Sequence, residues 1–157
     1  MAKSTPATQA LTRAKVAFEL QSYDYDPGAE RAGLQAAEAM GADPGEVFKT
    51  LMVELDGKPV CAILPADAEV NMKKLAAAFG GKSAKMMKPA DAERQTGYKV
   101  GGVSPLGQRK AVPAVLDASA GQLAAIYVNG GQRGLQIRIA PEALAGLLGC
   151  TMADLRR

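Results

Sequence analysis

The sequence has no histidine and no tryptophan in its 157 residues, and its aromatic side chains are limited to three phenylalanines and four tyrosines. The absence of histidine excludes Ser-His-Asp and Cys-His nucleophilic systems, imidazole general bases and most kinds of zinc site. The scarcity of aromatic residues argues against a stacking platform for single-stranded nucleic acid. Any catalytic chemistry must therefore come from backbone donors, lysines, hydroxyl groups or the substrate itself.

Several common motifs are also missing. The sequence has no P-loop, no GxGxxG fingerprint and no CxxC pair, which are the usual signs of nucleotide binding and thiol redox chemistry. No apolar run is long enough for a transmembrane helix, and residues 1–5 lack the hydrophobic core of a secretion signal. Cys61 and Cys150 each lie within an apolar stretch, which predicts small core side chains in a reducing compartment. We therefore expect a cytoplasmic protein.

The charge of the chain is unevenly distributed. The net charge is only +3, but residues 73–110 hold nine lysines and arginines against Asp91 and Glu93. That segment therefore carries a net charge of +7, and the rest of the chain carries −4. A basic segment of this kind suits a phosphate-bearing partner. Solvated lysines on surface helices would explain the same composition equally well.

Hydrophobic periodicity predicts short helices alternating with short strands. The expected helices cover residues 6–16, 29–40, 72–79, 89–96 and 141–148. The expected strands cover residues 18–22, 49–55, 59–64, 98–103, 112–116, 126–129 and 135–139. Asp56-Gly57 is the strongest hairpin signal, and Thr151–Asp154 has the capping-box pattern of a further helical turn. We expect one α+β domain over residues 1–157, with a mixed, largely antiparallel sheet.

A lysine opens an otherwise apolar strand. Lys49 stands at the start of the expected strand 49–55, with Thr50 beside it. A lysine in this position can direct its ammonium group across a cleft toward a phosphate. It can equally be an edge lysine that discourages strand pairing.

Two glycine-rich segments follow. In residues 97–107, Gly101 and Gly102 precede Ser104-Pro105, an arrangement in which backbone N–H groups can converge on an anion or oxyanion. Ordinary bulges and turns also require glycine. Residues 129–135 form either a plain hairpin loop or a loop that brings backbone amides and Arg133 to the mouth of a site.

Taken together, three motifs resemble the YbaK family, which comprises freestanding relatives of the editing domain inserted in bacterial prolyl-tRNA synthetases. The motifs are FKTL at residues 48–51, GYKVGGVSPLGQRK at 97–110 and YVNGGQRGL at 127–135. Residues 23–27 and 139–141 also fit, so the resemblance covers roughly residues 5–154.

The resemblance implies a deacylase that acts on mischarged aminoacyl-tRNA, chiefly Cys-tRNA(Pro). Prolyl-tRNA synthetase makes this product because cysteine is close to proline in size, and one such difference gives only about 1–3 kcal/mol of discrimination. The implied fold is a mixed sheet or distorted barrel flanked by helices. The implied partners are the acceptor 3′ end of the tRNA and prolyl-tRNA synthetase, in a ternary complex, with no cofactor, metal or membrane.

The resemblance also assigns roles at the site. Lys49 would anchor the phosphate of the terminal adenosine, and the backbone at Gly101 and Gly102 would hold the developing oxyanion. The thiol of the substrate's own cysteine would attack the ester and leave as a cyclic thiolactone. The implied substrate-binding residues are Tyr23, Thr50, Val103, Ser104, Pro105, Gly130, Gly131 and Arg133.

Two alternatives stay open. One is a deacylase for another mischarged tRNA, such as Ala-tRNA(Pro), although the long GGVSPLGQRK segment resembles the Cys-specific branch more closely. The other is a non-catalytic module that binds tRNA or the synthetase, which would tolerate the loss of Lys49 and the glycine pair. Met86-Met87 is interpreted as core filler.

Overall fold

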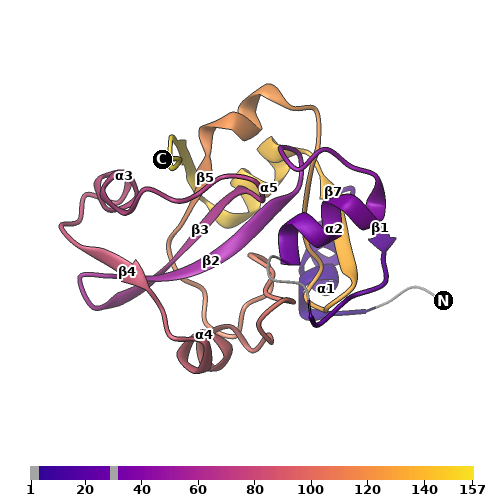
Figure 1. The fold of residues 1–157 in the computed structure, drawn as a ribbon, viewed down its shortest axis with the longest axis horizontal. Helices are drawn as coiled ribbons and strands as arrows, with labels where there is room; N and C mark the ends of the chain where they lie inside the picture. Colours follow the sequence, from indigo (N-terminus) through magenta and orange to yellow (C-terminus); the bar gives the residue numbers. More distant parts are fainter. Residues whose placement is uncertain (1–3, 29–31) are drawn as a thin grey trace.

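The computed structural model describes residues 4–28 and 32–157 and shows an α+β fold, as expected (Figure 1). The helices are α1 (Pro6–Arg13), α2 (Ala32–Met40), α3 (Met72–Ala78), α4 (Pro89–Thr96), the short 3-10 helix η1 (Ala118–Gln122) and α5 (Pro141–Leu148). The strands are β1 (Glu19–Ser22), β2 (Phe48–Leu55), β3 (Lys58–Pro65), β4 (Ala84–Met86), β5 (Ala114–Asp117), β6 (Ile126–Asn129), β7 (Leu135–Ile139) and β8 (Thr151–Ala153).

The larger sheet is mixed, with strand order β4-β2-β3-β5-β8. Its centre is the β2–β3 hairpin, which turns at Asp56 and Gly57 with φ values of 50° and 84°. Positive φ at both positions is the requirement of a type I′ turn, and this confirms the hairpin expected from the Asp-Gly pair. β4 runs antiparallel to β2, whereas β5 and β8 are added in parallel.

The smaller sheet is antiparallel, with strand order β1-β7-β6. Among the described residues it is bridged to the larger sheet once, in parallel, between Val47 and Tyr127, where the Tyr127 N–H donates to the Glu46 carbonyl at 2.9 Å. Within the described residues the two sheets do not close into a barrel. Of the two expected architectures, a mixed sheet and a distorted barrel, the structure therefore shows the mixed sheet. Figure 1 shows the smaller sheet with α1 and α2 on one side of β2, and α3, β4 and α4 on the other.

The main hydrophobic core lies between the two sheets. It joins Phe48 and Ile63 of the larger sheet to Ile137 of the smaller one, and it is sealed by Leu11 of α1 and Leu144 of α5. Burial of this apolar area supplies most of the favourable free energy of folding. Both cysteines are free thiols: Cys61 is buried in this core, as predicted, and Cys150 is half-buried at its edge.

Several predicted helix ends differ from the structure. α1 ends at Arg13, and the chain reverses there because Lys15 takes a left-handed conformation with φ of 58° and the Val16 N–H donates back to the Leu11 carbonyl. The structure describes α2 from Ala32, and residues 29–31 of the expected helix lie outside the described residues.

None of the described helices is long and apolar enough to cross a membrane.

Two predicted elements are wrong. Residues 98–103 form a loop in place of a strand, because Gly101 has φ of 90° and the Gly102 N–H closes a turn onto the Lys99 carbonyl at 2.8 Å. The expected helical turn at 151–154 is strand β8, which pairs with β5. Asp154, directly after β8, forms an ion pair with Lys74 at 2.7 Å, and no helix begins here in the structure. The sequence also gave no signal for β4 or η1.

Candidate functional site

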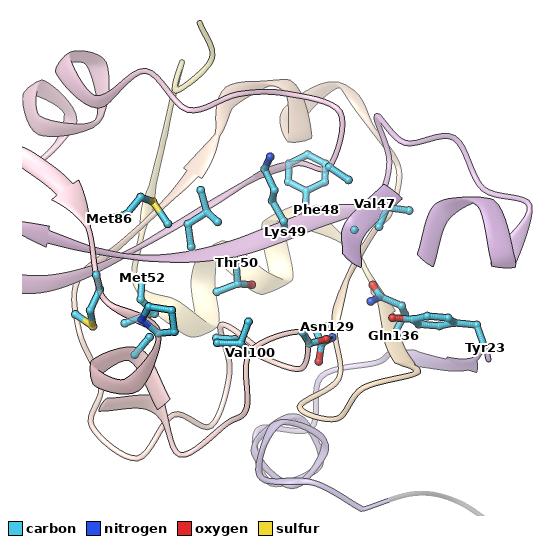
Figure 2. Close-up of a pocket in the computed structure, with 18 residues that line it drawn as sticks. Tyr23, Val47, Phe48, Lys49, Thr50, Met52, Met86, Val100, Asn129 and Gln136 are labelled. Carbon is cyan, nitrogen blue, oxygen red and sulfur yellow. The ribbon is translucent and has the colours of Figure 1, made fainter. Parts of the chain in front are cut away.

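A cavity of about 340 Å³ lies beside β2, where the smaller sheet approaches the loop that follows α4. β4 pairs only with Val53–Leu55 of β2, so the preceding edge of that strand is open to the cavity. Figure 2 shows β2 crossing above the loop that carries Val100, with side chains from both lining the space. A volume of this size is typical of sites for small ligands or for one end of a larger one.

The wall of the cavity is mostly apolar. Its apolar side chains include Val47, Phe48, Leu51, Met52, Met86, Met87, Pro89, Ala92, Val100 and Val103. The interpretation as core filler is wrong for Met86, which is 48% exposed in the cavity wall, whereas Met87 packs against the main core and also lines the cavity. The polar side chains in the wall are Tyr23, Lys49, Thr50, Asn129 and Gln136.

Lys49 is half-buried, and its ammonium group is held by the loop that follows β3. Its Nζ donates a hydrogen bond to the Ala68 carbonyl at 2.6 Å. Residues 69–71 of this loop are paired in turn with the end of the chain: the Arg157 N–H donates to the Glu69 carbonyl and the Asn71 N–H donates to the Leu155 carbonyl. The position of the lysine therefore depends on a segment more than a hundred residues away.

Two polar atoms in the wall are buried without a hydrogen-bond partner among the described residues. They are Oγ1 of Thr50 on β2 and Oε1 of Gln136 on β7. Thr50 and Lys49 are neighbours on a strand, and their side chains project to opposite sides of it (Figure 2). The Gln136 side chain is only 4% exposed. Buried polar groups in proteins are nearly always paired, so these two atoms are unusual.

Tyr23 follows β1 and is fixed through its backbone, because its N–H donates to the Gly134 carbonyl at 2.9 Å. Figure 2 shows its hydroxyl directed toward Gln136. Burial raises the pKa of the Tyr23 hydroxyl, and hydrogen bonding from the Gly134 backbone and the Gln136 amide offsets part of this rise. The hydroxyl therefore stays neutral near pH 7 and can donate a hydrogen bond.

The loop after α4 is anchored by Tyr98. Its side chain is buried and its hydroxyl donates to the Leu106 carbonyl at 2.7 Å. Burial raises the pKa of this hydroxyl to about 12, so it is not an acid or base near neutral pH. Gly101 and Val103 line the cavity. The Gly101 N–H donates to no described residue, whereas the Gly102 N–H is already bonded to Lys99.

The second glycine-rich loop braces the first. The Asn129 side chain accepts from the Gly131 N–H at 2.7 Å and donates to the Gly101 carbonyl at 3.1 Å. Arg133 donates from Nε to the Val100 carbonyl at 2.9 Å, and its guanidinium lies over the Tyr25 ring at 5.3 Å. These contacts hold the backbone at Gly101 against the smaller sheet.

The structure brings five of the eleven predicted site residues to the cavity: Tyr23, Lys49, Thr50, Gly101 and Val103. The other six lie outside the wall: Gly102, Ser104, Pro105, Gly130, Gly131 and Arg133. Ser104 is fully buried, and its Oγ accepts from the Leu106 N–H at 3.2 Å, so it shapes the loop from within and does not line the pocket. Gly102 packs tightly against the backbone of residues 132 and 133, and Gly130 packs tightly against Leu135. Both glycines therefore support the loops and do not contact the cavity.

Among the polar side chains of the wall, the sequence reasoning missed two, Asn129 and Gln136. Asn129 stands inside the YVNGG motif, directly before the glycine pair, where its amide can bond to the following turn. Gln136 alternates with the core residues Leu135 and Ile137 on β7, so it belongs to the opposite face of the strand. From the sequence, a glutamine on that face is expected to be solvent-exposed, whereas the tertiary structure leaves Gln136 only 4% exposed.

Comparison with known proteins places this architecture in a family. A model of the aminoacyl-tRNA editing domain matches residues 27–147. EbsC of Enterococcus faecalis, named for a Cys-tRNA(Pro)/Cys-tRNA(Cys) deacylase activity, is 43% identical over 121 residues, which are 76% of this chain and 73% of EbsC. The proline–tRNA ligase of Acidithiobacillus ferrooxidans is 30% identical over 87 residues, which are 55% of this chain and 15% of the ligase.

The fold agrees with these matches. A crystal structure described as that of a trans-editing enzyme for prolyl-tRNA synthetase superposes with a TM-score of 0.84 at 26% identity, and the alignment covers 99% of both chains. The family match includes all three motifs that carried the resemblance, at residues 48–51, 97–110 and 127–135. The chain therefore belongs to the aminoacyl-tRNA editing domain family.

Proposed function

We propose that this chain is a trans-acting deacylase that removes cysteine from Cys-tRNA(Pro), and also from Cys-tRNA(Cys), by cleaving the aminoacyl ester. The observation that carries the proposal is the cavity beside β2, which combines Lys49, the Gly101 backbone and an apolar wall in a member of the editing family. The activity for which EbsC is named supports the choice of amino acid.

In this proposal the protein contributes position and electrostatics. Lys49, fixed by the Ala68 carbonyl, attracts the phosphate of the terminal adenosine, and the aminoacyl group enters the apolar part of the cavity. The Gly101 N–H donates to the carbonyl oxygen as negative charge develops on it. The chain has no histidine to act as a base.

The nucleophile is the thiol of the substrate. Its sulfur attacks the ester carbonyl carbon, the bond to the ribose 3′-oxygen breaks, and the thiol proton passes to that oxygen. The products are a cyclic thiolactone and a tRNA with a free 3′-hydroxyl. Neither cysteine of the protein lines the cavity, and burial raises the pKa of the Cys61 thiol to about 12, which makes a protein thiolate a poor candidate.

The body of the tRNA would contact the basic segment. Lys88 and Lys99 are exposed beside the wall residues Met87 and Val100, and neither forms an ion pair with a described residue. Lysines in such positions bind phosphates without reading sequence. Selection of tRNA(Pro) would then come from prolyl-tRNA synthetase in a ternary complex, as the match to proline–tRNA ligases suggests.

The test is single-turnover deacylation of Cys-tRNA(Pro) and Ala-tRNA(Pro) by the wild type, by Lys49→Ala and by the control Lys58→Ala, which changes an exposed lysine of the hairpin. Loss of one charged hydrogen bond predicts a rate about tenfold to a hundredfold lower for Lys49→Ala on the Cys ester. The control should match the wild type, and thermal unfolding should show that both variants fold. Unchanged deacylation by Lys49→Ala would contradict the role of the lysine, and background rates for the wild type would contradict the proposed function.

A further inference from the structure

Gln136 has a feature that the proposed mechanism does not use. Its side chain is 4% exposed on β7, and its Oε1 is buried in the cavity wall with no hydrogen-bond partner among the described residues. Three such atoms occur in the described part of the chain, and two of them belong to Thr50 and Gln136, which line this one cavity. An unpaired buried acceptor is unfavourable, so its presence in a cavity wall indicates a ligand that completes the pairing.

The orientation of the amide restricts what that ligand group can be. Figure 2 shows the Gln136 amide and the Tyr23 hydroxyl directed toward one another, and hydrogen bonding from Gln136 is one of the causes that limit the rise in the pKa of that hydroxyl. With its nitrogen side directed toward Tyr23, the amide leaves its buried carbonyl oxygen without a hydrogen-bond partner among the described residues. A carbonyl oxygen only accepts hydrogen bonds, so the matching group of the ligand must be a donor.

The neighbouring polar side chains are less selective acceptors for a donor group of the ligand than the Gln136 oxygen. Both ends of the Asn129 amide are already used, by the Gly131 N–H and by the Gly101 carbonyl. The Thr50 hydroxyl can either donate or accept, so it does not select a donor. Among the described residues no carboxylate lines the cavity. A cationic donor that enters the cavity therefore has the Gln136 oxygen as its most selective neutral acceptor.

We infer that Gln136 is the residue that recognises the free α-ammonium group of the aminoacyl ester. The inference rests on the proposed deacylase function and adds a specificity to it: the enzyme cleaves aminoacyl-tRNA with a free amino group and spares N-acylated forms, whose amide is uncharged, bulkier and a weaker donor. The apolar wall at Met52, Met87 and Val100 then receives the side chain of the amino acid.

Two variants separate recognition from folding. Gln136→Met keeps the length of the side chain but removes the acceptor, and Gln136→Glu keeps an acceptor and adds a negative charge. The measurement is the single-turnover rate on Cys-tRNA(Pro) and on N-acetyl-Cys-tRNA(Pro) for the wild type and both variants. We expect the wild type to favour the free amine at least tenfold, Gln136→Met to lose about tenfold on the free amine alone, and Gln136→Glu to keep the preference.

Thermal unfolding distinguishes recognition from a purely structural role, because replacing a residue that only stabilises the fold would lower the unfolding midpoint. Because Gln136→Met removes an unpaired buried oxygen, its unfolding midpoint should equal or exceed that of the wild type. Equal losses on both substrates, or a wild type that cleaves both equally, would overturn the inference. The remaining alternative is that the Gln136 oxygen recognises the ribose 2′-hydroxyl, and a Cys-tRNA(Pro) that ends in 2′-deoxyadenosine tests it. If Gln136→Met has no effect on the rate with that substrate, the oxygen recognises the ribose and the inference is wrong.

Failure of the proposed function has a different signature. If the wild type cleaves neither ester, binding of 3′-cysteinylamino-3′-deoxyadenosine and of its N-acetyl derivative can be measured by calorimetry. The inference then predicts at least tenfold weaker binding of the acetylated compound by the wild type and similar binding of both by Gln136→Met. Equal affinity of the wild type for both compounds would overturn it.

Discussion

At the scale of single residues, the site depends on side chains whose partners lie far away in the sequence. Lys49 is held by the Ala68 carbonyl, and Gln136 lies against Tyr23. Neither contact is local, so neither could be read from a motif. The FKTL segment marks the position of Lys49, whereas Gln136 lies just after the YVNGGQRGL segment and no motif marks it. In both cases the pairing that gives the side chain its direction comes from the tertiary structure.

The two most strongly shifted groups at this scale predict how stability depends on pH. Burial raises the pKa of the Cys61 thiol and of the Tyr98 hydroxyl, each to about 12. Both groups ionise at lower pH in the unfolded chain than in the folded one, so the unfolded state loses protons first. The contribution of these two groups to the free energy of unfolding should therefore be constant below about pH 8 and fall as the pH rises toward 12.

Urea unfolding between about pH 7 and pH 11 measures this effect. Cys61→Ala lowers stability at pH 7, because it leaves a cavity in the core, but it should reduce the alkaline decline by removing the first of the two titrations. An identical decline in the variant and the wild type would show that Cys61 does not contribute to it.

At the scale of elements, the two glycine-rich loops behave as one unit. Arg133 bonds to the Val100 carbonyl, Asn129 bonds to the Gly101 carbonyl, and Gly102 packs directly on the backbone of the opposite loop. The sequence placed both loops near the site but expected a strand at 98–103. Hydrophobic periodicity suggested that strand, and the positive φ of Gly101 prevents it. The glycines here allow one loop to approach another closely.

Gly102→Ala tests this coupling. A Cβ at Gly102 would lie 2.9 Å from the Arg133 nitrogen and 3.1 Å from the Gln132 carbonyl carbon, so the opposite loop must move. Displacement of the Gly101 backbone should lower deacylation about tenfold to a hundredfold, although the Gly102 N–H itself is bonded to Lys99.

The matched control is Gly146→Ala on α5, where a Cβ would meet nothing within 4 Å. This exposed helical position should gain about 0.5–1 kcal/mol of stability and keep full activity. Full activity in Gly102→Ala would show that the spacing of the two loops is not important for the reaction.

At the scale of the whole molecule, the sequence predicted the α+β class and most elements but not their assembly. The hairpin at Asp56-Gly57 and the strands 126–129 and 135–139 were predictable because a local turn or a clear alternation defines them. β8 was not, because its parallel pairing with β5 overrides a local capping pattern. The cavity itself arises where two sheets meet at one bridge, an arrangement that has no local signal.

The central claim is that this cavity positions an ester for attack by the substrate's own thiol. The most direct test compares the wild type on Cys-tRNA(Pro) with S-methylcysteinyl-tRNA(Pro) in single turnover, with identification of the released product. The account predicts rapid release of a thiolactone from the first substrate and a background rate on the second, which has no free thiol. Release of intact amino acid from both substrates at similar rates would show that water is the nucleophile and would contradict the account.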